Sequence, residues 1–309
     1  MDVGAEESLP LVSIVTPCYN MARYVEQTVR SVLDQDYPHI EYIVMDGGST
    51  DGTLEILKKY EGRARIYSEP DQGAADAVNR GFERSRGSLL AFLNADDYYL
   101  PGAVATAARS LVAHPEVAGV YGEGLWVDQQ GRTIGEYPTA PFDAALLNEE
   151  CFICQPAAFF RRSAFQQAGG LDTSLQFAFD YDLWIRLARR HSMLKLDARL
   201  AASRMHRENK TLGARRRVFT ETIAILRKHY GYVPFRWVHA YASYLADRRD
   251  QFFEPLRPTF FKYAISLPLG LYYNRSHPVK FFAEWKSVMS RKGLARRLDE
   301  TWPWGHRLQ

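Results

Sequence analysis

The chain has 309 residues, 46% of them hydrophobic and 24% charged, which is enough for one large domain with a smaller extension. Its formal net charge of +3 is uneven, because residues 1–213 carry 21 basic against 29 acidic residues and residues 214–309 carry 18 against 7. No run of 18 apolar residues and no N-terminal signal pattern occurs, so we expect a cytoplasmic protein without a membrane span. The modest positive charge and the lack of a recognition motif argue against nucleic-acid binding.

Short apolar runs alternate with helical patterns through the first hundred residues. We predict strands at residues 11–16, 40–45, 64–67 and 89–93, and helices at residues 21–33, 53–60, 74–84 and from Pro101 to about His114. Strands that alternate with helices in this way form a mostly parallel sheet with helices on both faces, so the predicted fold class is α/β.

The pattern changes after residue 121. Residues 125–137 read as an antiparallel hairpin with its turn at Gln130-Gly131, followed by an amphipathic helix at 180–190 and a strand at 193–196. From about residue 215 the chain is basic, aromatic and predicted to be helical, with breaks at Pro234, Pro255, Pro258 and Pro268.

These patterns predict a catalytic domain at residues 1–213, with a donor half at about 9–122 and an acceptor half at about 123–213. Residues 214–309 are then a helical C-terminal extension. The three cysteines, Cys18, Cys151 and Cys154, are expected to be reduced structural thiols, since a zinc site would need a second C-x-x-C pair.

Three predicted strands end in polar residues: T-P-C-Y-N at 16–20, D-G-G-S-T-D-G at 46–52 and N-A-D-D at 94–97. The carboxyl ends of parallel strands share one sheet edge, where ligands bind in such folds. A carboxylate faces a diphosphate only across a divalent cation, and Mg²⁺ or Mn²⁺ prefers such oxygen ligands. The edge therefore predicts a metal-assisted diphosphate site.

The motifs V-T-P-C-Y-N, D-G-G-S-T-D-G-T, L-N-A-D-D and D-Y-D-L-W together resemble the inverting family 2 glycosyltransferases of GT-A fold, over residues 11–206. The resemblance implies that Pro17, Tyr19 and Asn20 border the base and ribose and that Asp46 hydrogen-bonds the base. The other donor-side residues that it implies are Ser49 and Asp51 in the turn beneath, Asp71, Asn79, Asn94, Ala95 and Asp96. Asp71 and Asn79 read equally well as ordinary turn and helix-surface residues.

The metal-binding carboxylate implied by the resemblance is Asp96, with Asp97 beside it. Asn94 stands where the family's D-x-D element has its first Asp, which removes one charge from the site. His206 is either a ligand of the metal or diphosphate or a solvated histidine. Arg204 and Lys210 would suit a pyrophosphate.

On the acceptor side, Asp180 matches the family's general base, although Phe179 precedes it where Glu is usual. An acceptor hydroxyl needs a base to take its proton, and a helix-starting Asp, far in sequence from Asp96, suits that task. Asp182 is an alternative base, and Asp180 reads also as a simple helix cap. Trp184 and Gln155 are the remaining acceptor-side residues implied by the resemblance.

The aromatic and basic residues from about Phe235 onward have two interpretations. Amphipathic helices of this composition bind membrane surfaces, which would place the protein peripherally at the inner face of the membrane. The alternative is that the aromatics pack as a helical core against the catalytic domain or against a second copy of the chain.

The sequence as a whole predicts an inverting glycosyltransferase that moves a sugar from a nucleotide-sugar, UDP-linked by preference, to a saccharide or lipid-linked saccharide with Mn²⁺ or Mg²⁺. The alternative is a catalytically silent nucleotide- or sugar-binding module, because Asn94 and Phe179 depart from the family pattern. A dinucleotide-dependent oxidoreductase would need G-x-G-x-x-G after the first strand, and residues 16–24 contain no glycine.

Overall fold

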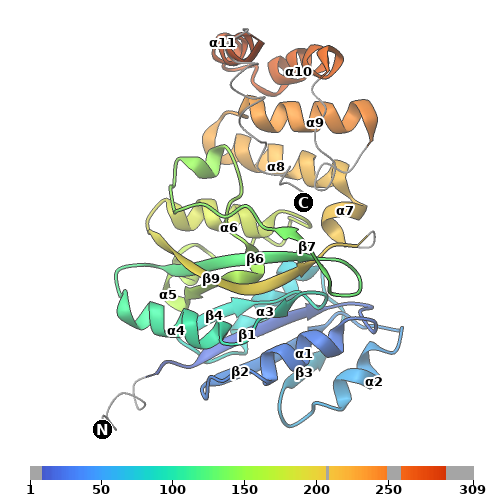
Figure 1. Cartoon of the computed structure of the whole chain (residues 1–309), viewed down its shortest axis with the longest axis vertical. Coiled ribbons are helices and arrows are strands. Elements are labelled where there is room, and N and C mark those ends of the chain that lie inside the picture. Colours follow the sequence, from blue (N-terminus) through green and yellow to red (C-terminus); the bar gives the residue numbers. More distant parts are fainter. Residues whose placement is uncertain (1–8, 207–208, 249–258, 290–309) are drawn as a thin grey trace. The chain divides into compact units, whose positions relative to one another are not determined.

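The computed structural model describes residues 9–206, 209–248 and 259–289 (Figure 1). The chain forms two compact units. Unit 1 combines Met1–Ala144 with Cys151–Met205, and unit 2 combines Ala145–Glu150 with His206–Gln309.

The first half of unit 1 contains the predicted alternation of strands and helices. In chain order its elements are β1 (Val12–Cys18), α1 (Val25–Leu33), β2 (Ile40–Asp46), α2 (Thr53–Lys58), β3 (Arg65–Ser68), α3 (Ala74–Glu83), β4 (Leu89–Phe92), β5 (Tyr98–Tyr99) and α4 (Ala103–Ala113). Strand β1 pairs in parallel with β2 and β4, and β2 pairs in parallel with β3. The predicted parallel sheet of this half is confirmed.

The second half of unit 1 completes a mixed sheet. Its elements are β6 (Gly119–Val127), β7 (Thr133–Glu136), a 3₁₀ turn at Gln155–Ala157, β8 (Ala158–Arg161), α5 (Arg162–Gln167), α6 (Phe179–Ala188) and β9 (Met193–Arg204). The strand order is β3-β2-β1-β4-β8-β6-β9-β5, with β7 on β6. The predicted hairpin is confirmed, with Gly131 at φ +82° in its turn. Strands β5 and β8 were not predicted, and β8 runs antiparallel between β4 and β6.

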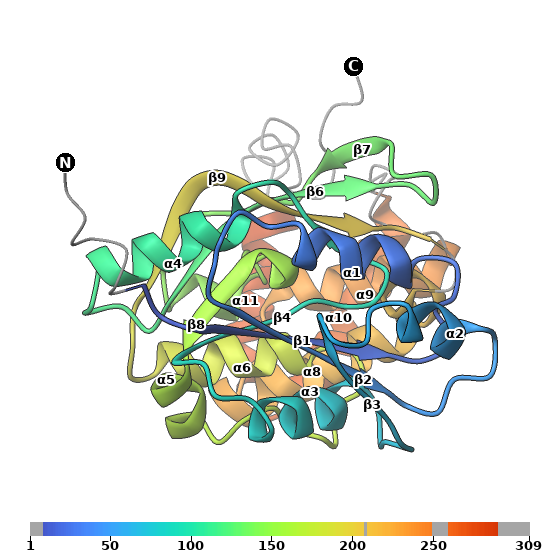
Figure 2. The same ribbon diagram turned by 90° about the horizontal axis from the view of Figure 1, so that it is seen from below.

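Helices cover both faces of this sheet, as Figure 2 shows: α1 and α4 lie on one side and α3, α5 and α6 on the other. Neighbouring residues of β1 point to opposite faces, as a strand requires. Ile14 belongs to the core formed with α1 and α4, whereas Val15 lies against Gly81 of α3. The central strands β1, β2 and β4 are thus buried on both sides, and their ends are left to bind ligands.

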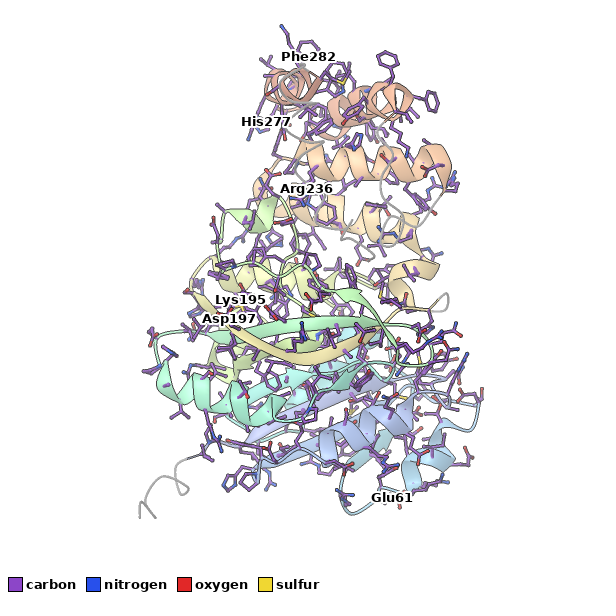
Figure 3. The ribbon with its side chains drawn as sticks, viewed as in Figure 1. Glu61, Lys195, Asp197, Arg236, His277 and Phe282 are labelled. Carbon is purple, nitrogen blue, oxygen red and sulfur yellow. The ribbon has the colours of Figure 1, made fainter. Side chains whose placement is uncertain are left out.

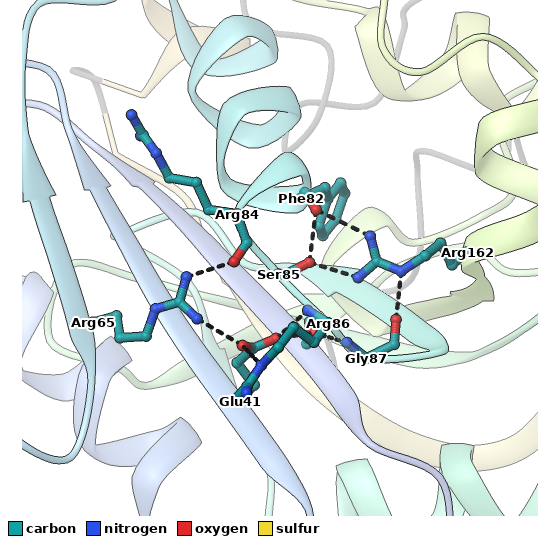
Figure 4. Close-up of polar contacts among 9 residues, drawn as sticks. Glu41, Arg65, Phe82, Arg84, Ser85, Arg86, Gly87 and Arg162 are labelled. Atoms are coloured by element: carbon teal, nitrogen blue, oxygen red, sulfur yellow. Dashed lines mark hydrogen bonds and ion pairs between the residues drawn. The ribbon is translucent and has the colours of Figure 1, made fainter.

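The amino ends of the strands are fixed by the buried carboxylate of Glu41 (Figure 4). It accepts hydrogen bonds from the Ser13 hydroxyl at 2.6 Å, from Arg65 Nη1 at 2.8 Å and from the Arg86 backbone N–H at 2.6 Å. These contacts join β1, β2, β3 and the loop before β4. This end of the sheet is therefore structural, and the polar strand exits lie at the other end.

Unit 2 is helical where it is described, as predicted. Its helices are α7 (Lys210–Gly213), α8 (Arg215–Tyr230), α9 (Phe235–Asp247), α10 (Phe260–Tyr273) and α11 (Pro278–Met289), and a 3₁₀ turn lies at Leu146–Asn148. Pro234 precedes α9 as predicted, but Pro268 lies inside α10 and does not end it. Pro255 and Pro258 lie outside the described residues. None of the described helices has the length and apolar character needed to cross a membrane.

Candidate functional site

The loops after β1 and β2 are joined by hydrogen bonds between them. Asn20 has a left-handed backbone, with φ +52°, and its N–H donates to the Ser49 hydroxyl at 2.7 Å. In return, the Thr50 N–H donates to Asn20 Oδ1 at 2.9 Å. The Ala22 N–H donates to Asp51 at 3.1 Å. Asn20, Ser49 and Asp51 therefore hold two strand exits in a fixed relation.

The Asp46 carboxylate, at the end of β2, is directed into this turn. It accepts hydrogen bonds from the backbone N–H groups of Gly48 at 3.1 Å and Ser49 at 3.0 Å, and from the Ser68 hydroxyl at 2.7 Å. Only 1% of the residue is exposed. In this arrangement the carboxylate organises the turn and has almost no surface left to meet a base.

Tyr19 and Asp71 flank the same glycine. A Cβ on Gly47 would lie 2.7 Å from Asp71 Oδ2 and 3.4 Å from Tyr19 Cδ2, so the absent side chain lets both residues approach. The Asp71 carboxylate also accepts a hydrogen bond from the Gly73 N–H at 2.8 Å. Tyr19 is 59% exposed. An exposed aromatic face beside a carboxylate suits a planar base that carries an N–H donor.

Pro17 and Asn79 lie within a strand and a helix, and not in the turns at the strand exits. Pro17 is buried within β1. The Asn79 carboxamide forms a reciprocal pair with Leu171, donating from Nδ2 to its carbonyl at 2.9 Å and accepting from its N–H at 2.9 Å. Asn79 therefore joins α3 to the segment that precedes α6.

The two carboxylates of the turn after β4 have different surroundings. Asp97 is buried and accepts hydrogen bonds from the Arg204 N–H at 2.8 Å and from Asn94 Nδ2 at 3.3 Å. Burial and the adjacent Asp96 carboxylate raise the pKa of Asp97 to about 8. Ala95 is buried and Asp96 is half-buried. Asp96 is therefore the carboxylate of this pair with surface available to a ligand.

Arg204, at the end of β9, is buried behind this turn. Its guanidinium donates from Nε to the Asp96 carbonyl at 3.0 Å, and from Nη1 to the carbonyls of Asp128 and Gln129, both at 3.0 Å. It also donates from Nη2 to Gln27 Oε1 at 2.6 Å. A direct pyrophosphate contact, which the sequence suggested for Arg204, does not fit this inward orientation.

Carboxylates from all three strand exits act electrostatically on one buried thiol. Burial, followed by the charges of Asp46, Asp51 and Asp96, raises the pKa of Cys18. Carboxylates that act on one thiol in this way lie close together, as expected where adjacent parallel strands end. The edge is therefore strongly acidic and attracts a cation.

Helix α6 supplies two aspartates with different environments. Asp182 is fully buried and forms a 2.7 Å ion pair with Arg186. Asp180 is half-buried in the first turn of the helix, where its Oδ1 accepts a hydrogen bond from the Tyr181 N–H at 2.9 Å. Of the two candidate bases, Asp180 alone has exposed surface.

The turn before β8 is hydrogen-bonded to the end of β4 and to the acidic turn that follows it. Gln155 donates from Nε2 to the Phe92 carbonyl at 2.7 Å and accepts from Asn94 Nδ2 at 3.1 Å, so its buried carboxamide is held against β4 and the acidic turn. Burial raises the pKa of the adjacent Cys154, and the charges of Asp97 and Asp180 raise it further. This thiol is therefore within electrostatic reach of both the acidic turn and α6.

Trp184 and His206 are both buried, with almost no exposed surface. Trp184 is fully buried, with its ring edge-on to Phe160 at 6.0 Å, so any effect on an acceptor would act through packing. His206 is the first residue of unit 2 after β9 and is also buried. The side chain of Lys210 is outside the described part of the chain.

Within the described residues, no group of three or more His, Cys, Asp or Glu side chains is arranged to hold a metal ion. Mg²⁺ commonly binds through one or two carboxylates, with water and substrate phosphates as its other ligands. The half-buried Asp96 carboxylate at an acidic edge fits that second pattern. The chemistry of the site thus suits a hard cation that arrives together with a diphosphate.

The comparisons with known proteins agree with this site. The model of glycosyl transferase family 2 matches residues 13–169, from β1 through α5. TuaG of Bacillus subtilis (strain 168), a glycosyltransferase provisionally named for teichuronic acid biosynthesis, is 50% identical over 92 residues, which are 28% of this chain and 36% of TuaG. The chain therefore matches about a third of the length of that relative.

Two solved structures are similar in fold. Staphylococcus aureus TarS 1-349 in complex with UDP-GlcNAc superposes with a TM-score of 0.64 at 16% identity, over 95% of this chain and 89% of the TarS 1-349 chain. The mannosyltransferase PcManGT of Pyrobaculum calidifontis, in complex with GDP-Man and Mn²⁺, superposes with a TM-score of 0.57 at 17% identity, over 96% of this chain and 80% of that one. With its GT-A fold and its acidic strand exits, the chain belongs to glycosyl transferase family 2.

Proposed function

We propose that this glycosyltransferase moves a sugar from a UDP-sugar to a saccharide or a lipid-linked saccharide, with inversion at the anomeric carbon. The observation that carries the proposal is the ring contact between Phe92 and Phe179, whose centroids are 6.0 Å apart. Phe92 ends β4 just before the acidic turn of Asp96 and Asp97, and Phe179 begins α6 just before Asp180. This contact supports a single site that combines the donor-side carboxylate pair with a candidate base from a distant part of the chain.

On the donor side, we place the base against the exposed ring of Tyr19, with the Asp71 carboxylate as acceptor for an N–H of the base. Their joint approach to Gly47 supports this placement. Asp46, Ser49, Asp51 and Asn20 would act through the turn that they hold, because their hydrogen bonds are made within it. A uracil N–H suits a carboxylate acceptor, and TarS is a neighbour that was crystallised with UDP-GlcNAc.

On the metal side, we propose that Asp96 holds Mn²⁺ or Mg²⁺, with Asp97 fixing the turn from behind. A cation bound there would neutralise the charge that develops on the departing diphosphate. The half-buried position of Asp96 and the surrounding carboxylates support this assignment, and PcManGT is a neighbour solved with Mn²⁺. Asn94, held by Asp97 and Gln155, would keep the turn in place.

On the acceptor side, Asp180 takes the proton of the attacking hydroxyl. Attack from the side opposite the departing diphosphate inverts the anomeric centre, so an α-linked donor gives a β-linked product. Asp182 is excluded from this role in the proposal because it is fully buried and paired with Arg186. The polysaccharide-related name of TuaG supports a saccharide acceptor.

The rival function is a binding module without turnover, which the departures at Asn94 and Phe179 favour. Screening nucleotide-sugars for Mn²⁺-dependent transfer or donor hydrolysis separates the two. We expect Asp96→Ala to abolish turnover and metal-dependent UDP binding, and Asp180→Asn to keep UDP binding but lower turnover by a factor of about 10²–10⁴. Normal turnover in Asp180→Asn would show that the base is misassigned, and UDP affinity without any turnover of the wild type would favour the binding module.

A further inference from the structure

Helix α10 of unit 2 has its polar and apolar sides reversed relative to a helix that faces water. Its buried residues are Lys262, Tyr263, Ser266 and Gly270, whereas its exposed positions include Phe260, Phe261 and Tyr272. These three aromatics are 78%, 64% and 62% exposed. A surface helix of a globular protein normally buries its apolar stripe, so this face is built to contact something other than water.

The inward side of α10 is well satisfied, so the reversal is not a packing defect. The Lys262 ammonium forms a 2.6 Å ion pair with Asp247 of α9. The Ser266 hydroxyl donates to the Tyr263 carbonyl at 2.7 Å. Gly270 lets the Phe281 ring of α11 pack directly against the helix, because a Cβ there would overlap that ring. Turning α10 over would break the ion pair with Asp247 and the contact with Phe281.

The apolar face continues onto α11 and the turn before it. Val279 is exposed, and Phe282 lies on the outer side of α11 (Figure 3). Of the eight large hydrophobic residues exposed within the described part of the chain, five belong to this face: Phe260, Phe261, Tyr272, Val279 and Phe282. Such clustering marks an interaction surface rather than scattered exposed side chains.

The charges around this face have one sign. The exposed charged residues of segment 259–289 are Arg275, Lys280 and Lys286. The segment has one acidic residue, Glu284, and it points inward, accepting hydrogen bonds from the Tyr232 hydroxyl and from the Phe235 N–H. An apolar, aromatic face with a purely cationic border is complementary to an anionic lipid surface.

We propose that the face formed by α10, α11 and their connecting turn binds the surface of an anionic phospholipid membrane, with the aromatic rings at headgroup depth and the cations on lipid phosphates. A second copy of the chain is a poorer occupant. A two-fold contact through the same face would bring its cations close to those of the copy, and the face as the structure describes it offers them no exposed acidic partner. Attachment of this kind needs no spanning helix.

The test is flotation of the full chain with vesicles of phosphatidylcholine alone and with vesicles of an equimolar phosphatidylcholine–phosphatidylglycerol mixture. We expect the wild type to float with the mixed vesicles and the double variant Phe260→Ser/Phe261→Ser to bind them about tenfold less. Val112→Ser on α4, at a residue 48% exposed, is the matched apolar control and should bind as the wild type does. Since all three positions are exposed, the variants should fold, which circular dichroism verifies.

The charge arm uses Lys286→Glu, with Lys59→Glu, at the exposed residue that follows α2, as its matched control. We expect Lys286→Glu to weaken binding to the mixed vesicles severalfold more than the control does. Equal binding to both vesicle types, no vesicle binding by the wild type, or unchanged binding of the Phe260/Phe261 variant would each overturn the proposal. If light scattering shows a dimer that the same double variant dissociates, and no vesicle binding occurs, the face would instead bind a second copy of the chain.

Discussion

Replacing Arg204 with Met tests how the acidic turn is held in place. The guanidinium donates to four acceptors, the carbonyls of Asp96, Asp128 and Gln129 and the Gln27 side chain. A hydrogen bond of this kind contributes about 1 kcal/mol net, and the acceptors are only partly buried, so water replaces some of them. We therefore expect the free energy of unfolding to fall by about 2–4 kcal/mol.

Urea unfolding followed by circular dichroism measures this loss, with Arg109→Met on the exposed surface of α4 as the matched control. The control should stay within about 0.5 kcal/mol of the wild type. Arg204→Lys keeps the charge but has one donor group in place of the planar fork, so we expect an intermediate loss. If Arg204→Met is as stable as the Arg109→Met control, the account of Arg204 as the support of the turn is wrong.

Three further variants test other parts of the site and the sheet. Glu41→Gln should destabilise the protein at pH 7: burial raises the pKa of Glu41, but hydrogen bonds from Ser13 and Arg86 and the charge of Arg65 outweigh it and hold the pKa below its usual range. Its stabilisation is present at neutral pH and lost on acidification, so the gap in unfolding free energy should shrink below about pH 4, and a gap independent of pH would contradict this. Gly47→Ala should weaken UDP binding severalfold in calorimetry, because its Cβ would lie 2.7 Å from Asp71 Oδ2; unchanged affinity would remove Asp71 from the base site. Asp182→Ala should cost about 3 kcal/mol in urea unfolding by breaking a buried ion pair, yet keep turnover per folded molecule, and a selective loss of turnover would make Asp182 the base.

Much of unit 1 could be predicted from hydrophobic periodicity, because β1, β2 and β4 are largely apolar and each ends at a polar turn. Parallel pairing then places those turns at one edge by geometry alone. Strand β8 was missed because it is four residues long and follows a Pro-containing turn, and β5 because a two-residue strand has no period. Both are defined by their partners in the sheet.

The roles of individual polar residues were harder to predict, since sequence does not show which way a side chain points. Asp46 and Asp71 are both turn carboxylates in sequence, but only the structure shows that the first faces inward and the second approaches Tyr19. Arg204 likewise reads as a basic residue near a strand end, which is compatible with a phosphate contact or with a buried support. The D-G-G motif did offer one usable signal, because Gly47 allows the close approach of Asp71.

The aromatic residues of the C-terminal part separate into two groups that the sequence did not distinguish. Phe235, Tyr263 and Phe281 are buried, and the ring of Phe235 contacts the other two, so these aromatics form a core within unit 2. The predicted packing against the catalytic domain or a second copy stays a prediction. Phe260 and Phe261 are exposed. A simple helical period would have placed the apolar residues of α10 inward. The ion pair of Lys262 with Asp247 holds the opposite side of the helix inward, and this pairing could not be read from the pattern.

The most direct test of the proposed chemistry is the anomalous diffraction of crystals soaked with Mn²⁺ and UDP. The proposed mechanism predicts one manganese peak in direct contact with the Asp96 carboxylate and with diphosphate oxygens. A diphosphate bound at the strand exits with no metal at Asp96 would contradict it.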